Sequence, residues 1–214
     1  MSAASEIRAV YERWAPVYDR GQWGPEHLGL GRLRRRVVSR ARGRVLEVGI
    51  GTGVNLPYYP SPCAIHGVDL SPSMLERAVA RAHRLGRHLV VEAMDAEVLG
   101  FPDRSFDTVL STLTLCTTPD PVRLLREMAR ICRPAGRVLL LEHGLGTARP
   151  MNWLLRRLAP GHLRRCACDL TRDVAALPAQ AGLRVAREER YLFGVFTLID
   201  AAPGDPEARR EGAG

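Results

Sequence analysis

The sequence contains no lysine. All 31 basic residues are arginines, set against 23 acidic residues, which gives a formal net charge of +8 and a pI of about 9.9. Genomic base composition is the simplest cause of this exclusive use of arginine. Whatever the cause, guanidinium groups bind phosphate well and suit an anionic membrane surface. No zinc-finger, RNP-type or helix-turn-helix pattern accompanies the charge, so we expect no nucleic-acid partner.

Long hydrophobic runs are also missing. No apolar stretch reaches the ~18 residues that a membrane-spanning helix needs, and residues 1–7 contain no apolar signal core. We therefore expect a cytoplasmic protein whose contact with a membrane, on its inner face, is peripheral.

Cysteine is sparse, odd in number and scattered, which is typical of reduced thiols rather than of a disulfide framework. Cys166 and Cys168, with His162 nearby, can be read as metal ligands. The paired Cys-x-x-Cys units of a structural zinc site are absent, however. We expect two ordinary thiols there and no metal site.

Two amphipathic helices are predicted before residue 43. The first covers residues 4–20, with a break expected at Pro16. A loop is expected from Gly21 to Pro25. The second helix covers residues 26–41 and opposes leucines and valines to a run of arginines, which we expect on a solvated face.

The first of these helices carries an unusual set of aromatic residues on one face. Tyr11, Trp14 and Tyr18 recur at helical spacing, and such side chains are costly to leave in water. We predict that residues 1–42 form a lid over a ligand cleft. Tyr18 is expected to face the cleft and Tyr11 to lie in the core beneath the lid.

From residue 44 onward, short apolar runs alternate with helical patterns, which predicts a doubly wound, parallel α/β sheet with helices on both faces. Two closing strands are joined tightly enough to be antiparallel. Residues 43–202 are predicted to form this domain, and residues 203–214 a disordered tail. Strands are expected at 44–48, 64–69, 88–93, 106–112, 136–142, 185–191 and 193–200, and helices at 72–85, 120–132, 151–158 and 172–181.

The first strand runs directly into a glycine-rich turn, Glu47-Val-Gly-Ile-Gly-Thr-Gly53. Glycine lets the backbone bend sharply and lets a ligand approach without meeting a Cβ atom. The carboxylate of Glu47 at the mouth of the strand would repel a pyrophosphate. The turn therefore favours a ligand that carries a positive charge.

Acidic residues follow the next two strands, and the ligands of such sheets bind beyond the carboxyl ends of the strands. Asp69 lies 18 residues after Gly51, where it is placed to accept the two hydroxyls of a ribose. Asp95 and the backbone of Ala96 suit an adenine edge. The cleft thus fits an adenosine without phosphate, with a cationic end near Glu47.

Together these segments resemble the class I S-adenosylmethionine-dependent methyltransferases over about residues 11–200. The glycine turn resembles the first motif of that family. Further matching segments are Gly67–Leu75 around the ribose, Met94–Ala96 with Phe101-Pro102 around the adenine, Ser105–Asp107 on the fourth strand, and Leu125–Glu127 with Arg133–Gly136 before the fifth strand, with Ala135 where glycine is usual.

The resemblance implies a Rossmann-like, seven-stranded and mostly parallel sheet with an antiparallel last strand. It also implies S-adenosyl-L-methionine as the cofactor, bound by Glu47, Gly49, Gly51, Gly53, Asn55, Asp69, Leu70, Met74, Asp95, Ala96 and Thr112. For catalysis, His143 is the candidate general base and Tyr18 a candidate orienting group. A histidine that only hydrogen-bonds Glu142 or a neighbouring loop is the alternative.

The methyl acceptor is less defined, because the chain resembles two groups within that family. Tyr11–Asp19 and Phe193–Ile199 resemble bacterial phosphatidylethanolamine N-methyltransferases, whereas Leu113–Thr117, Leu141–His143 and Cys166–Arg172 resemble alkyl thiol methyltransferases. The leading hypothesis is N-methylation of a phospholipid head group at a membrane surface. A small-molecule thiol, a quinone or a secondary metabolite as acceptor, and a cofactor-binding module without catalysis, are the alternatives. The oligomeric state stays open.

Replacing Asp69 with alanine should weaken cofactor binding by more than about tenfold, because the ribose hydroxyls lose charge-assisted hydrogen bonds that contribute ~1.5–3 kcal/mol. Isothermal titration calorimetry measures the change, and an unaltered affinity would contradict the ribose assignment. Gly51→Val is the steric counterpart, and its side chain should abolish binding by filling the path of approach.

Overall fold

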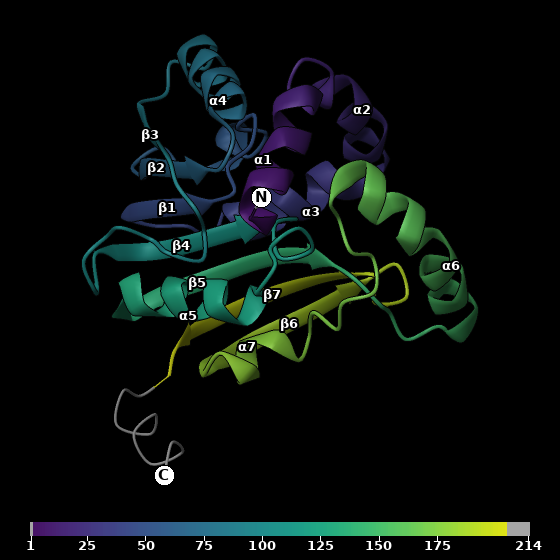
Figure 1. Ribbon diagram of the computed structural model, residues 1–214. Coiled ribbons are helices and arrows are strands. Elements are labelled where there is room, and N and C mark those ends of the chain that lie inside the picture. The colour runs from purple at the N-terminus through teal and green to yellow at the C-terminus, as the bar shows by residue number, and fades with distance from the viewer. Residues whose placement is uncertain (1, 205–214) are drawn as a thin grey trace.

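The computed structural model describes residues 2–204, which form a sheet with helices on both faces (Figure 1). Its strands are β1 (Arg44–Val48), β2 (Ala64–Asp69), β3 (Leu89–Ala93), β4 (Phe106–Thr112), β5 (Cys132–His143), β6 (Leu183–Tyr191) and β7 (Phe196–Pro203). They lie in the order β3-β2-β1-β4-β5-β7-β6. Within these residues only the pairings of β7, with β5 and with β6, are antiparallel. The expected Rossmann-like sheet with an antiparallel last strand is confirmed.

The helical elements divide into those that cover the sheet and those that lie at the carboxyl ends of its strands. α3 (Gly31–Val38) and α4 (Pro72–Arg84) pack on one face, and α5 (Pro121–Ile131) and α7 (Leu177–Gln180) on the other. α1 (Ala3–Trp14) and α6 (Arg149–Cys166) contact each other at the strand ends (Figure 1). The remaining elements are α2 (Tyr18–Pro25), a π-helical turn η1 (Glu26–Leu30) and a 3-10 turn η2 (Leu56–Tyr58).

Alternation along β5 distributes its side chains between two hydrophobic cores. Val138 and Leu140 belong to the core beneath α5, whereas Leu139 and Leu141 belong to the core beneath α3. Val37 of α3 contributes to that second core. The division into a lid over residues 1–42 and a domain over residues 43–202 stays a prediction, and α3 is integral to the core of the domain.

Two predicted interruptions of helices are wrong. The loop expected at Gly21–Pro25 is the helix α2, because glycine costs only ~1 kcal/mol in a helix and Asp19 is held by Thr52 and Arg81. The helix expected over residues 151–158 continues through Pro160 as α6 and ends at Cys166. Proline has a helical φ and removes one hydrogen bond, and on an exposed helix water can satisfy the carbonyl that it leaves unpaired.

The helix predicted for residues 172–181 is reduced to α7, because side chains pull the preceding segment into turns. Thr171 donates its hydroxyl to Asp169 instead of capping a helix, and Arg172 donates to the carbonyl of Thr118. The predicted tail also begins too early, since Pro203 ends β7. Its remainder, residues 205–214, lies outside the described residues.

The sheet places a crevice where its strand order reverses. β1 pairs with β2 on one side and with β4 on the other, so the chain leaves the ends of β1 and β4 in opposite directions. Such a point is where ligands bind in open α/β sheets. Over residues 2–204, the helices are all too short or too polar to cross a membrane.

Candidate active site

The glycine-rich turn after β1 borders a cavity at the carboxyl ends of the strands, here called the strand-end cavity. Gly49 and Gly51 have φ angles of 70° and 56°, which favour glycine. A Cβ atom on Gly49 would lie 2.3 Å from Oγ1 of Thr114, whereas one on Gly51 would meet no described atom within 4 Å. Gly49 therefore permits close packing, and Gly51 leaves the open side of the turn to a ligand.

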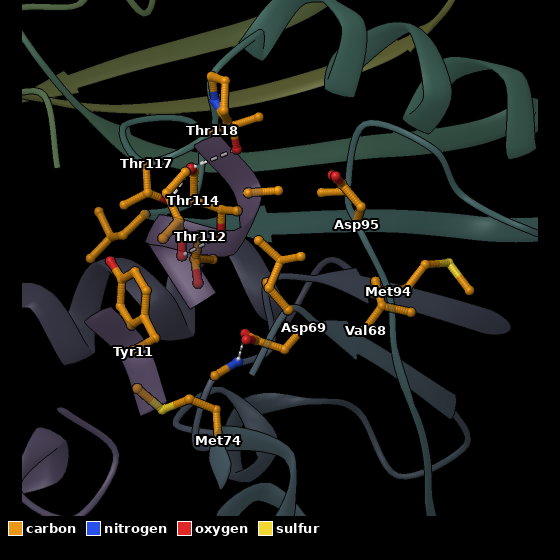
Figure 2. A pocket seen from close by; sticks show the side chains of 18 of the residues that line it. Tyr11, Val68, Asp69, Met74, Met94, Asp95, Thr112, Thr114, Thr117 and Thr118 are labelled. Carbon is orange, nitrogen blue, oxygen red and sulfur yellow. Dashed lines mark hydrogen bonds between the residues drawn. The ribbon is translucent and has the colours of Figure 1, made fainter. Parts of the chain in front are cut away.

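Asp69, the last residue of β2, faces the same cavity (Figure 2). Its Oδ2 accepts a hydrogen bond from the backbone N–H of Gly51, and its Oδ1 accepts one from that of Ser71, both at 2.9 Å. Burial raises the pKa of this carboxyl, while the two backbone donors act in the opposite direction. The carboxylate joins the two loops and keeps lone pairs for hydroxyl donors.

Most of the predicted cofactor residues line the strand-end cavity. The predicted residues in its lining are Tyr18, Gly49, Gly51, Asp69, Leu70, Met74, Asp95, Ala96 and Thr112. Their contact with the cofactor stays a prediction. The cavity is also lined by residues that were not among the predicted cofactor residues, namely Tyr11, Met94, Thr114 and Thr117.

Glu47 is directed away from the strand-end cavity, which corrects the expectation of a carboxylate facing the ligand. It is 1% exposed, and its two oxygens accept hydrogen bonds from Asn55 Nδ2 at 2.6 Å and from the Tyr59 hydroxyl at 2.7 Å. Burial raises the pKa of Glu47 to about 7 against these two donors. Gly53 is likewise a packing residue, since a Cβ atom there would lie 2.7 Å from Leu56 Cδ1.

Arg34 of α3 is a site residue that the sequence analysis missed. Its side chain is 2% exposed, and Nε donates to Glu26 Oε1 at 2.7 Å. Nη1 donates to Asn55 Oδ1 at 3.2 Å and to Thr112 Oγ1 at 2.7 Å. Asn55 is therefore buried behind the wall of the strand-end cavity and does not line it. We call Glu26, Arg34, Glu47, Asn55 and Thr112 the buried polar network.

A signal for Arg34 was present in the helical periodicity. Arg34 follows Leu30 by four residues and precedes Val37 and Val38 by three and four, so it shares the buried face of α3. The run of arginines concealed this position, because arginines on a surface helix are ordinarily solvated.

Two carboxylates fasten α1 and α2 to the rim of the strand-end cavity. Glu12 accepts hydrogen bonds from the hydroxyls of Ser71 and Ser73, and the bond from Ser73 lowers the pKa of Glu12. Asp19 accepts from Thr52 Oγ1 at 2.6 Å and from Arg81 at 2.7 Å. The N-terminal helices are thus tied to the glycine turn and to α4.

A second cavity, here called the cysteine cavity, lies between α1, α2, α6 and the end of β5. Its lining consists of Val10, Tyr11, Trp14, Tyr18, Gly21, Gln22, Leu113, Cys116, His143, His162, Cys166 and Cys168. Tyr11, Tyr18 and Leu113 line both cavities and so form the boundary between them. Tyr11 was expected in the core and instead faces both cavities. Burial raises the pKa of Tyr18 to about 12, which keeps its hydroxyl protonated.

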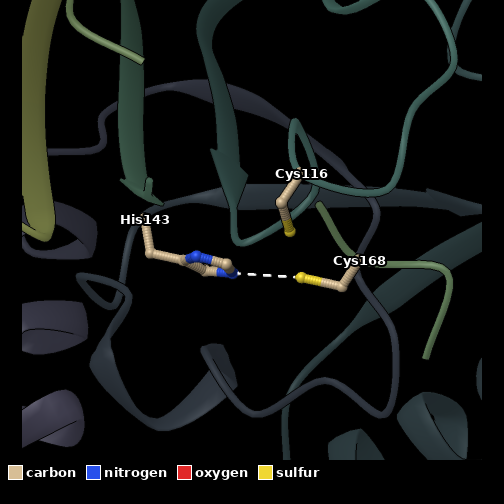
Figure 3. A group of neighbouring side chains, drawn as sticks. All are labelled: Cys116, His143 and Cys168. Atoms are coloured by element: carbon tan, nitrogen blue, oxygen red, sulfur yellow. Dashed lines mark hydrogen bonds between the residues drawn. The ribbon is translucent and has the colours of Figure 1, made fainter. Parts of the chain in front are cut away.

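Cys116, His143 and Cys168 meet in the wall of the cysteine cavity (Figure 3). His143 Nε2 lies 3.2 Å from the Sγ of Cys168. The interaction with Cys116 lowers the pKa of Cys168, and His143 acts in the same direction against burial. Burial alone would lower the pKa of His143, but the hydrogen bond with Cys168 raises it. His143 thus pairs with a thiol, and its role as a general base stays a prediction.

Glu142 is held by other partners, so it is not the hydrogen-bonding partner of His143. Its carboxylate accepts from the hydroxyl of Ser111 and from the backbone N–H groups of Thr114 and Leu115. The three-residue cluster was missed because its members are far apart in the sequence. The thiols that the sequence did single out, Cys166 and Cys168, line one cavity, but only Cys168 belongs to the cluster.

This geometry defines a class of protein: a Rossmann-like α/β fold with one cavity at its strand ends and a second cavity beside it. Residues 46–140 match the family described as "Methyltransferase domain". The chain is 41% identical over 143 residues to a phosphatidylethanolamine N-methyltransferase from Cereibacter sphaeroides, covering 64% of this chain and 70% of that protein.

Other relatives support the same family. A thiol S-methyltransferase from Homo sapiens is 34% identical over 135 residues, covering 60% of this chain and 55% of that protein. A chain in the complex of the Haloferax volcanii Trm112 methyltransferase activator with a putative methyltransferase has a TM-score of 0.72 at 21% identity, covering 93% and 98% of the two chains, and shows the fold. The chain belongs to the class I S-adenosylmethionine-dependent methyltransferases.

The strand-end cavity fits S-adenosylmethionine, the cofactor of this family. Gly51 leaves the space that a close-lying ligand needs, Asp69 offers a carboxylate to ribose hydroxyls, and Asp95 and Ala96 border the far end. When bound, the cofactor supplies an electrophilic methyl group on a sulfonium. The task that this chemistry would leave to the protein is to hold the two reactants in line and to keep water out.

Arg34→Met should destabilise the fold by about 3 kcal/mol, because removing one partner of a buried ion pair leaves Glu26 and Asn55 unsatisfied. Urea unfolding followed by circular dichroism measures the free energy of unfolding. The control is Arg35→Met on the exposed face of the same helix, where a change within about 0.5 kcal/mol is expected. Equal effects of the two substitutions would contradict the role assigned to the buried polar network.

The ionisation of Glu47 should lower the free energy of unfolding as the pH rises. Its folded-state pKa of about 7 lies above the ~4.3 of an unfolded chain. The folded protein therefore keeps a proton on Glu47 that the unfolded chain loses. The stabilisation that this proton gives to the folded state is full below about pH 4.3 and is lost as the pH rises to about 7. Glu47→Gln has no such proton, so from pH 5 to pH 8 its unfolding free energy should gain about 2–3 kcal/mol relative to the parent.

Denaturant titrations at a series of pH values test this expectation. Glu76→Gln, at an exposed position of α4, serves as the control and should show no pH-dependent difference from the parent. A constant difference between Glu47→Gln and the parent across this range would show that Glu47 is ionised throughout.

Proposed function

We propose that this methyltransferase N-methylates the amine head group of a phosphatidylethanolamine-type phospholipid and works peripherally on an anionic membrane surface. The activity named for the Cereibacter sphaeroides relative supports the acceptor. The observation that carries the proposal is the surface of α6, the helix that borders the cysteine cavity.

α6 combines exposed apolar residues with a strong positive charge. Its sequence, Arg149–Cys166, contains five arginines and no carboxylate, and none of its residues is buried. Large apolar side chains remain in solvent, among them Trp153 at 65% and Leu158 at 52% exposure, together with Leu154 and Leu163. A basic helix with exposed apolar residues is suited to lie in the interface of an anionic bilayer.

The arginines of the second N-terminal helix are less suited to this role than the sequence indicated. Arg34 is buried, and Arg36 and Arg40 both form ion pairs with Glu189 of β6. Their charge is partly neutralised within the protein. The membrane-facing role therefore falls on α6, which also contributes His162 and Cys166 to the lining of the cysteine cavity.

A head group that enters the cysteine cavity would reach the boundary formed by Tyr11, Tyr18 and Leu113. The protonated hydroxyl of Tyr18 can orient the reacting nitrogen. An ammonium has no lone pair, so a proton must first leave, and His143 is the titratable side chain of this wall that is suited to accept it. Enclosure by α1 and α2 limits the access of water.

Methylation of a small-molecule thiol is the second candidate. It is favoured by one observation, the grouping of Cys116, His143 and Cys168 in the wall of the cysteine cavity. Side chains of this kind suit a sulfur nucleophile better than an alcohol or a carbon acid. The human relative, named as a thiol S-methyltransferase, is consistent with this candidate.

Transfer of a labelled methyl group to two acceptors in parallel separates these proposals. Phosphatidylethanolamine in mixed vesicles should be labelled, and a short alkyl thiol should not. The reverse result would establish the thiol candidate. Cofactor binding by calorimetry without transfer to either acceptor, or to any component of a lipid extract, would favour a binding module without catalysis.

Flotation with anionic vesicles at low salt should recover the protein, and Leu154→Ser combined with Leu158→Ser should lower this binding by at least about tenfold. Burying one leucine side chain fully in the bilayer contributes ~1.5–3 kcal/mol to membrane binding. A tenfold loss of binding corresponds to about 1.4 kcal/mol, so losing two partly buried leucines is enough to produce it. Leu85→Ser, at the end of α4, is the control, because Leu85 is 44% exposed but lies on another surface. Failure of the parent to float would count against a lipid acceptor.

A further inference from the structure

Three soft or borderline metal donors converge in the wall of the cysteine cavity. The sulfur atoms of Cys116 and Cys168 and a ring nitrogen of His143 all lie within 4.8 Å of one another. Two thiolates and one imidazole are ligands that Zn²⁺ prefers, and hard cations such as Mg²⁺ do not use this set. All five cysteines are free, so both thiols are available.

The separations are compatible with one shared ion. Donors bound to one Zn²⁺ at ~2.3 Å for sulfur and ~2.0 Å for nitrogen lie roughly 3–4 Å apart in a tetrahedral site. The distance of 3.2 Å between Cys168 Sγ and His143 Nε2 falls in this range. Figure 3 shows Cys116 and Cys168 directing their sulfur atoms toward the same ring edge of His143.

Each donor is supplied by a separately anchored segment. His143 ends β5, where it pairs with Phe196 of β7. The N–H of Asp169, next to Cys168, donates to the carbonyl of Cys116 at 2.8 Å and so joins two of the three segments. Arg172 donates to the carbonyl of Thr118 at 2.6 Å. The donors are therefore held together before any ion binds, which lowers the cost of ordering them.

The site has an open side. Cys116 and Cys168 are 2% and 6% exposed, yet both line the cysteine cavity together with His143. Three protein ligands with a fourth position left to water or substrate is the arrangement of catalytic zinc sites, whereas structural sites are closed by four. His162 and Cys166 line the same cavity but lie outside the group of three.

We propose that Cys116, His143 and Cys168 bind one Zn²⁺ ion whose fourth coordination position opens into the cysteine cavity. This inference goes beyond the proposed function, and it competes with one step of it, the deprotonation of an amine by His143. Coordination occupies Nε2 of His143 and removes that nitrogen as a general base. A sulfur ligand can fill the open position, whereas an amine that coordinates there loses the lone pair it needs for attack.

Cobalt titration of the full-length chain tests the site. The protein is stripped of metal with a chelator, kept reduced, and titrated with Co²⁺ in the absence of oxygen. One Co²⁺ per chain should bind and produce a thiolate-to-cobalt charge-transfer absorption, with the intense visible bands of a four-coordinate ion. Zn²⁺ should displace it. Adding 2-mercaptoethanol should shift the visible bands, because its sulfur takes the open position.

Variants identify the ligands. Cys168→Ser and His143→Gln should each lower Co²⁺ affinity by more than ~100-fold, since losing even an outer-shell partner costs about 10–100-fold. Cys166→Ser in the same cavity and Cys63→Ser elsewhere should retain the parent affinity. Zn²⁺ should raise the thermal midpoint of the parent and leave that of the ligand variants unchanged, which separates lost binding from misfolding.

Several results would overturn the proposal. These are the absence of charge-transfer absorption and an equal loss of affinity in Cys166→Ser. Bands that do not respond to 2-mercaptoethanol would overturn the open position. The titration contains no methyl donor, so no transfer takes place in it, and a failure of metal binding is distinguishable from a failure of the proposed function.

Discussion

The burial of one guanidinium constrains how the N-terminal helices meet the rest of the protein. Removing the charge of Arg34 from water costs several kcal/mol unless its partners offset the loss. Those partners come from three places: Glu26 from η1, Asn55 from the loop after β1, and Thr112 from the end of β4. Because Thr112 also lines the strand-end cavity, the position of α3 and the shape of that cavity are coupled.

This coupling links the strand-end cavity, which fits the cofactor, to the cysteine cavity, which is the proposed site of the acceptor. The network fixes α3, and α1 and α2 are then held over the strand ends by Glu12 and Asp19. Tyr11 and Tyr18 are thereby placed on the boundary between the two cavities. A shift of these helices would alter the strand-end cavity and the cysteine cavity at once, so the two cavities cannot be positioned independently.

The features that the sequence predicted well are local, and those it missed depend on pairing between distant segments. The strands β1, β2 and β3 and the acidic residues at or just after their ends follow from short patterns. The direction of Glu47 does not: it follows from alternation in β1, in which Val45 faces the core beneath α3 and Leu46 the core beneath α5. The topology of the sheet decides which of these two faces borders the ligand. The contact among Cys116, His143 and Cys168 likewise forms only when distant segments of the chain pack together.

Two relatives with different named acceptors both align with this chain, because the segments that form the strand-end cavity and those that form the cysteine cavity are largely separate in the sequence. The family match covers residues 46–140, which contain the glycine turn, Asp69 and Asp95. Most of the cysteine cavity lies outside that range, on α1 and α2, at His143, and from His162 to Cys168. A family match over residues 46–140 therefore carries little information about the acceptor. Under the proposed function, the acceptor is selected by the chemistry of the cysteine cavity and by the surface that leads to it.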